Sequence, residues 1–203
     1  MKQMIRQEPQ RPPDSPEAAV MRCAFTGCRP QKMPFGFNEE DLRCMDFKRR
    51  IGRGIAALIA GGCSHFLTGG ALGFDTFAAE AVMDLRREHP WITLEIAVPF
   101  PGQPAYWDSR SQDRYRWILN QADIVTCISD SYTQSCMDQR NRYLVDHCDL
   151  LVAAWSGLPG GTEQTLAYAR SVGREIRIIP ITPDGMNLEC GILIPHHGKP
   201  GAA

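Results

Sequence analysis

Apolar residues along the chain follow two alternating patterns, short continuous runs and longer stretches with helical spacing. The short runs predict six β-strands, at residues 20–26, 64–68, 92–98, 124–128, 150–155 and 176–181. The longer stretches predict five helices between them, at about residues 39–60, 74–87, 110–121, 137–147 and 162–172. This alternation is typical of an α/β fold.

Strands separated by helices predict right-handed crossovers and therefore a Rossmann-like, doubly wound, mainly parallel sheet of about six strands with helices on both faces. Runs 124–128 and 150–155 are almost continuously apolar, which predicts central strands buried on both sides. Gly173, directly after the last helix, is expected to cap it in a left-handed conformation.

One domain is expected, because 203 residues with 43% hydrophobic content can fill a single core. Residues 1–19 hold four prolines among charged residues and are predicted to be a disordered N-terminal segment. The domain is expected to span residues 20–183. Residues 184–203 show no clear periodicity and are predicted to be a C-terminal tail.

Charge and cysteine content narrow the classes of function. With 22 basic and 23 acidic residues, the net charge of −1 does not favour nucleic acid or an anionic membrane as a partner. The eight cysteines form no C-x-x-C pair and are expected to be mostly buried core residues. No apolar segment is long enough to span a bilayer, and the N-terminus does not resemble a signal peptide, so we expect a cytoplasmic protein.

No metal site is predicted, because the histidines lack ligand spacing with carboxylates or cysteines. They are His65, His89, His147, His196 and His197. Any chemistry is instead expected in the loops that follow the strands, since ligands of doubly wound sheets bind at the carboxyl ends of strands.

The first two strands end in glycine turns. Thr26-Gly27-Cys28-Arg29-Pro30 places a guanidinium where it could reach a phosphate, although a simple βα turn explains it equally well. Thr68-Gly69-Gly70-Ala71-Leu72-Gly73-Phe74-Asp75 runs into a helix, whose N-terminus favours an anion. Asp75 is either a capping carboxylate or an acceptor for ribose hydroxyls. The spacing is neither a Walker A loop nor a strict G-x-G-x-x-G.

Two later strand ends are also candidates. Pro99-Phe100 is followed by Trp107 and an arginine-rich run through Tyr115, which could supply an aromatic surface for a base and arginines for phosphates. The alternative is a solvated basic helix with both aromatic residues in the core. The run from Gly157 to Thr165 opens another helix, where Thr162 could simply be an N-cap.

Two glycine-rich turns in one sheet predict a phosphate-bearing ligand held between two helix N-termini. Arg140 and Asn141, near the start of the preceding helix, could point into the same cleft, or belong to a surface arginine cluster.

In this order, these motifs resemble the SLOG superfamily and most closely its YpsA-like branch, over about residues 20–181. The resemblance implies a Rossmann-like fold that binds or senses a nucleotide or a nucleotide-derived, ADP-ribose- or NAD-like ligand, with a homodimer as the expected assembly. It implies no established reaction and no other cofactor. The implied ligand-binding residues are Thr26, Gly27, Arg29, Gly69, Gly70, Gly73, Asp75, Pro99, Phe100, Arg140, Asn141, Gly160, Gly161, Thr162 and Thr165.

Two relatives in the superfamily offer alternatives. LOG-type phosphoribohydrolases carry P-G-G-x-G-T-x-x-E; here the second G-T is missing and Tyr168 stands three residues after Thr165, so a hydrolase would depend on Glu163 or Asp75 as acid or base. DNA-processing protein A, a single-strand DNA binder, has a similar S-G-x-A-x-G-I-D loop and R-N-R run. The balanced charge of this chain does not favour that activity.

Overall fold

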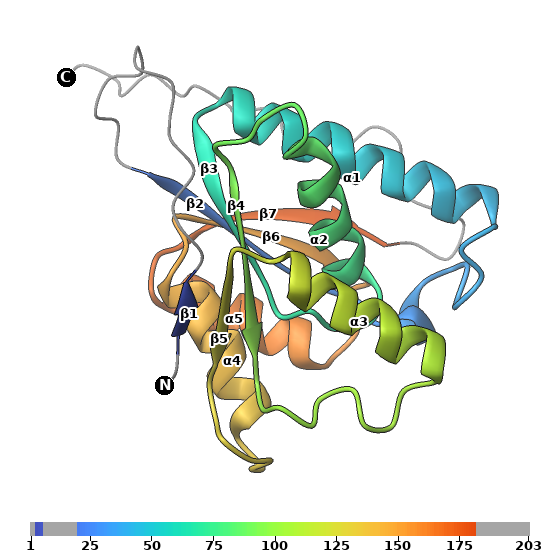
Figure 1. Cartoon of the computed structure of the whole chain (residues 1–203), viewed down its shortest axis with the longest axis vertical. Coiled ribbons are helices and arrows are strands. Elements are labelled where there is room, and N and C mark those ends of the chain that lie inside the picture. Colours follow the sequence, from blue (N-terminus) through green and yellow to red (C-terminus); the bar gives the residue numbers. More distant parts are fainter. Residues whose placement is uncertain (1–2, 6–19, 182–203) are drawn as a thin grey trace.

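A single sheet organises the chain in the computed structural model, which describes residues 3–5 and 20–181. The strand order is β1-β5-β4-β3-β2-β6-β7, and β2 to β7 all run parallel (Figure 1). The strands are β1 (Gln3–Ile5), β2 (Met21–Gly27), β3 (Cys63–Thr68), β4 (Thr93–Val98), β5 (Ile124–Cys127), β6 (Leu150–Trp155) and β7 (Glu175–Pro180). The sequence predicts the six parallel strands but not β1, which pairs antiparallel with β5.

Five helices cover the two faces of the sheet (Figure 1). They are α1 (Leu42–Ala60), α2 (Phe74–Leu85), α3 (Ser109–Gln121), α4 (Cys136–Asp146) and α5 (Gly161–Ser171). Helices α1, α2 and α3 pack into one apolar core and α4 and α5 into the other. The predicted Rossmann-like architecture is therefore confirmed. A short 3-10 helix, η1 (Pro30–Lys32), follows β2.

The two cores differ in the side chains that fill them. On the α1 side, the rings of Phe25, Phe66, Phe74 and Phe47 contact one another with centroids about 6 Å apart. On the α4 side, small residues such as Ala24 and the other alanines of the strands let α4 and α5 approach the sheet closely. Seven free cysteines lie in the described residues and six of them are buried, as expected.

The burial of two strands differs from that predicted for central strands. Leu150 to Ala154 of β6 are completely buried, as predicted. In β5 only Thr126 is buried, so the prediction for this strand was wrong. The reason is its position, since its outer neighbour is the three-residue β1. Gly173 has φ +69° after α5, which confirms the left-handed cap.

The position of β2 determines where a ligand can bind. Its neighbours are β3, which follows it through α1, and β6, which comes much later in the chain. The connections therefore leave β2 and β6 toward opposite faces of the sheet. Such a topological switch point opens a crevice at the carboxyl ends of the two strands.

A buried polar cluster lies on the α4 side of the sheet, centred on Glu95. Its carboxylate accepts hydrogen bonds from the hydroxyls of Thr126 and Tyr143, both at 2.7 Å, and lies 3.0 Å from His65 Nε2. Burial alone would raise the pKa of Glu95, but these hydrogen bonds outweigh it, so the pKa lies below its usual value. The ionised carboxylate thus ties β3, β4, β5 and α4 together.

We expect Glu95→Leu to lower the free energy of unfolding by about 2 kcal/mol at neutral pH, because buried donors lose their acceptor. Since the folded pKa is depressed, this contribution is present above the unfolded pKa and is lost as pH falls through the folded pKa. Urea unfolding at neutral and acid pH measures both effects. Glu175→Leu, at an exposed strand residue, is the control with little expected change. Equal stability of the two variants at neutral pH would contradict the prediction.

Candidate functional site

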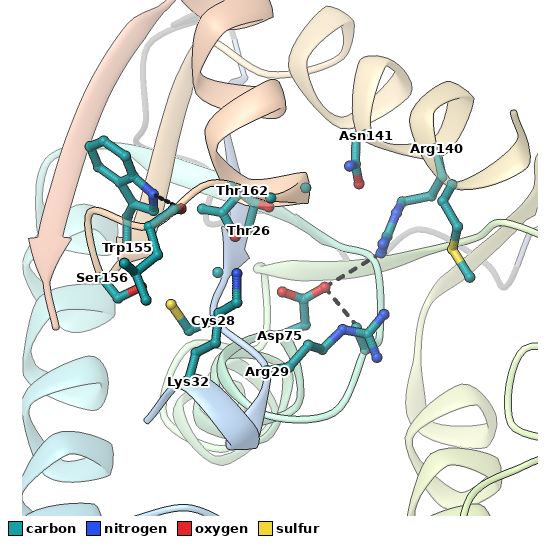
Figure 2. Close-up of a pocket in the computed structure, with 16 residues that line it drawn as sticks. Thr26, Cys28, Arg29, Lys32, Asp75, Arg140, Asn141, Trp155, Ser156 and Thr162 are labelled. Atoms are coloured by element: carbon teal, nitrogen blue, oxygen red, sulfur yellow. Dashed lines mark hydrogen bonds and ion pairs between the residues drawn. The ribbon is translucent and has the colours of Figure 1, made fainter. Parts of the chain in front are cut away.

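A cleft of about 240 Å³ lies where the topology predicts it, at the carboxyl ends of β2 and β6. Its walls come from the loop after β2, the turn before α2, the first half of α4 and the loop from β6 into α5 (Figure 2). The lining residues are Thr26, Gly27, Cys28, Arg29, Lys32, Ala71, Asp75, Met137, Arg140, Asn141, Trp155, Ser156, Leu158, Gly160, Gly161 and Thr162.

The cleft is positively charged although the whole chain is not. Three basic residues, Arg29, Lys32 and Arg140, line it together with one carboxylate, Asp75. Lys32 Nζ donates to the carbonyl of Pro159 at 2.8 Å, which holds its ammonium beside the loop that leads into α5. The described part of the cleft therefore carries an excess of positive charge suited to an anion.

Asp75 and Arg140 are the two buried residues among these four charged side chains. Asp75 is 4% exposed and Arg140 is 6% exposed, and Nη1 of the arginine lies 3.4 Å from Oδ2 of the aspartate (Figure 2). Burial raises the pKa of Asp75, and the charges of Arg140 and Arg29 and the N–H groups of Ala71 and Gly69 oppose this shift. Burial lowers the pKa of Arg140, but a guanidinium stays protonated in proteins.

Two polar groups of the cleft are buried without a hydrogen-bond partner among the described residues. They are Nε of Arg140 and Oγ of Ser156. An unsatisfied buried donor costs about 1–3 kcal/mol, so proteins rarely keep one without a reason. The two residues lie on opposite sides of the cleft (Figure 2).

The N-terminus of α5 opens into the cleft. Its first intrahelical bond runs from the N–H of Gln164 to the carbonyl of Gly160, so the N–H groups of the first turn are available to a ligand. The N-cap is Gly160; the alternative that Thr162 is the N-cap is wrong, because Thr162 lies inside the first turn. A Cβ on Gly161 would meet only Asn141 Nδ2, at 3.9 Å. The first turn of α5 therefore has space for an anion beside its N–H groups.

The glycine turn before α2 is filled by protein atoms instead. A Cβ on Gly73 would lie 2.6 Å from the carbonyl oxygen of Cys28, and that oxygen accepts the N–H of Phe74. A Cβ on Gly69 would overlap Nη1 of Arg140. Because Gly73 has no side chain, the carbonyl of Cys28 can approach it, and because Gly69 has none, the guanidinium of Arg140 can do the same. Protein atoms therefore occupy the turn before α2, whereas the first turn of α5 lines the cleft.

Nine of the fifteen predicted ligand-binding residues line the cleft, and six do not. The nine are Thr26, Gly27, Arg29, Asp75, Arg140, Asn141, Gly160, Gly161 and Thr162. The six outside it are Gly69, Gly70, Gly73, Pro99, Phe100 and Thr165. Phe100 packs edge-on against Tyr132 with ring centroids 5.4 Å apart, and the hydroxyl of Thr165 donates to the carbonyl of Gly161. Of the two candidate catalytic residues, Asp75 lines the cleft, whereas Glu163 is exposed outside it.

The arginine-rich run in α3 does not reach the cleft. Arg114 is held by the carboxylates of Glu39 and Glu80. Tyr115 is buried, which supports the core alternative for that residue. Cleft residues that the sequence analysis does not identify include Lys32, Trp155 and Ser156. A second basic residue three positions after Arg29 is the feature that could have indicated Lys32.

Some predictions concern other parts of the chain. Cys190, His196 and His197 lie outside the described residues. Among the helices that the structure does describe, none combines the length and the apolar character needed to cross a membrane.

Comparisons with known proteins agree with the fold and the motifs. The YpsA family model, of the YspA SLOG family, matches residues 23–169. The SPbeta prophage-derived protein YoqJ of Bacillus subtilis is 32% identical over 140 residues, which cover 63% of this chain and 81% of YoqJ. A UPF0398 protein of Bacillus pumilus is 26% identical over 168 residues, which cover 82% of this chain and 90% of that protein.

Two solved structures are similar in fold. One is DNA processing protein A from Helicobacter pylori, described for its single-stranded DNA binding mode, with TM-score 0.56, 16% identity, and coverage of 82% of this chain and 68% of that one. The other is DNA processing protein A from Streptococcus pneumoniae, with TM-score 0.54, 16% identity, and coverage of 79% and 50%. At this identity the likeness concerns the fold alone.

Proposed function

This chain belongs to the YspA SLOG family, and we propose that its cleft binds the phosphate of a nucleotide or of a nucleotide-derived, ADP-ribose- or NAD-like ligand. The observation that carries the proposal is a pair of buried polar atoms, Arg140 Nε and Ser156 Oγ, that have no partner among the described residues and lie in a cleft lined by three basic side chains. Both atoms can bind a phosphate or ribose oxygen.

The ligand is oriented by the uneven charge of the cleft. A phosphate binds at the first turn of α5, where backbone N–H groups and the helix dipole favour an anion and Lys32 lies nearby. Asp75 would repel a phosphate at the opposite wall, so this carboxylate accepts a hydrogen bond from a ribose hydroxyl instead. Arg29 lines the same cleft.

Gly161→Asp tests the phosphate position. The substitution adds a carboxylate at the first residue of α5, where there is room for it and where the helix dipole stabilises it. It is expected to weaken ADP binding about tenfold or more, because the carboxylate competes with the phosphate for the same N–H groups. Thermal-shift titration with ADP and ADP-ribose measures the loss, since a ligand of the native state raises the melting temperature.

The matched control is Gly161→Asn, which has nearly the same shape and no charge. It should retain most of the ligand-induced shift. If the two variants bind ADP as tightly as the unsubstituted chain, the phosphate does not bind at α5. If the unsubstituted chain shows no shift with ADP, ADP-ribose or NAD, the proposed function is wrong.

A second candidate function is hydrolysis of such a nucleotide derivative. It is favoured by Asp75, the one carboxylate among the described lining residues, whose pKa is raised by burial toward that of a general acid. Product analysis after incubation with AMP, NAD and ADP-ribose tests it. Turnover that Asp75→Asn abolishes while binding persists would establish the reaction; binding without turnover would leave the binding function alone.

A further inference from the structure

A second cavity of about 310 Å³ shares Arg29 with the charged cleft. Its other lining residues are Gln31, Phe37, Leu72, Tyr106, Trp107 and Asp108. We propose that this aromatic pocket binds the base of the nucleotide whose phosphate lies in the cleft. The inference rests on the proposed function and names the part of the ligand that the second pocket recognises.

The adjacency of the two cavities supports the proposal. Arg29 lines both, and the neighbouring residues Ala71 and Leu72 line one each. The cleft alone is smaller than the usual range of roughly 300–1,000 Å³ for small-molecule sites, whereas the two cavities together fall within it. A ligand that occupies both is therefore extended, with its charged part beside α5 and its other part beyond Arg29.

The side chains of the second pocket identify that other part as a planar ring. Phe37 is 62% exposed and Tyr106 is fully exposed, so neither aromatic ring is occupied by core packing. Trp107 is half-buried and is held edge-on against Tyr115, with ring centroids 5.2 Å apart. An aromatic ring held in this way can stack against a base, and a guanidinium such as Arg29 stacks on the same kind of surface.

The pocket also has polar groups at its edge. Asp108 caps α3 by accepting the N–H of Ser111 at 3.0 Å, and this fixes the position of its carboxylate. Its oxygens can accept hydrogen bonds from an amino group of a base. An apolar, aromatic surface with a few fixed polar groups is the usual composition of a ligand site.

Calorimetric titration of the full chain with ADP and with inorganic pyrophosphate separates the two parts of the ligand. ADP carries the base and the ribose, and pyrophosphate carries neither, so the aromatic double variant is needed to isolate the base. We expect ADP to bind more tightly than pyrophosphate, with about tenfold of the difference contributed by the stacked base. The double variant F37A and Y106A should lose this tenfold contribution of the base and bind pyrophosphate as tightly as before. Tyr132→Ala, at another exposed aromatic residue outside both cavities, is the control and should leave both affinities unchanged.

The outcomes distinguish this inference from the proposed function. If pyrophosphate and ADP bind equally, or the double variant loses no ADP affinity, the aromatic pocket does not bind the base although the cleft binds phosphate. If neither ligand binds, the proposed function itself fails. If a short oligothymidine binds and ADP does not, the surface belongs to single-stranded DNA, and the inference is overturned.

Discussion

Arg140→Met is expected to lower the free energy of unfolding by about 3–5 kcal/mol at neutral pH, a large share of the stability of a domain of this size. The reason is the buried carboxylate of Asp75, which loses the guanidinium 3.4 Å away while it remains only 4% exposed. Urea unfolding followed by circular dichroism measures the change. Arg142→Met on the same helix is the control, because its ion pair with Asp138 is about half exposed and contributes little.

The loss should depend on pH in a defined direction. The folded pKa of Asp75 is raised by burial, so the folded state binds more protons than the unfolded state, and stability falls as pH rises from the unfolded to the folded pKa. Without Arg140 the folded pKa rises further and the fall extends to higher pH. The stability difference between variant and unsubstituted chain is therefore expected to grow from about pH 4 to pH 7.

Adding Asp75→Asn to Arg140→Met should recover part of the loss, because a buried amide carries no charge. Two results would contradict a stabilising ion pair between Arg140 and Asp75. One is a double variant that is no more stable than Arg140→Met, and the other is a stability difference that does not change with pH. A double-mutant cycle isolates the interaction from the packing that methionine changes.

The fold and the position of the cleft can be predicted from the sequence for a simple reason. Parallel strands separated by helices have one topology that is strongly preferred, and its ligands bind at the carboxyl ends of the strands. Arg29, Asp75 and Gly161 directly follow or lie near such strand ends, and all three line the cleft. Arg140 also lines the cleft, as the family resemblance implies, but its burial could not be predicted, because the local pattern of α4 does not distinguish an exposed arginine from a buried one.

The roles of the individual glycines could not be predicted in the same way. A glycine before a helix can leave space for a ligand, as Gly161 does, or for other protein atoms, as Gly69 does for Arg140. The two cases have the same sequence pattern and differ only in what the rest of the chain places there. The same holds for β5, whose apolar run resembles a central strand although its outer neighbour is the short β1.

The aromatic pocket shows the same limit for residues far apart in the chain. Trp107 could be identified from the sequence as a surface for a base, since aromatic and basic residues follow the strand end at Phe100. Phe37 and Leu72 come from two other loops, and only the packing of η1 and the α2 turn brings them beside Trp107. Local pattern therefore locates single residues of the site, and tertiary packing assembles them.

Gly73→Ala is expected to lower the free energy of unfolding by about 3 kcal/mol. Gly73 has φ +93° and ψ −127°, a conformation that alanine adopts only with strain of about 1–3 kcal/mol. Its Cβ would also lie 2.6 Å from the carbonyl oxygen of Cys28, which is backbone and cannot rotate away. The change separates β2 from α2 and widens the cleft wall that holds Arg29, so ADP affinity should fall as well.

Gly52→Ala supplies a control of opposite sign for that substitution. Gly52 lies inside α1 with no atom near its missing Cβ and without a positive φ, so alanine should stabilise the chain by about 0.5–1 kcal/mol through its higher helix propensity. Thermal and urea unfolding of both variants measure the contrast, and calorimetry with ADP measures the effect on the cleft. Because both changes add the same methyl group, a similar effect of the two would show that the turn before α2 relaxes to accept a side chain. A destabilised Gly73→Ala variant with unchanged ADP affinity would mean that the turn supports the fold without shaping the ligand site.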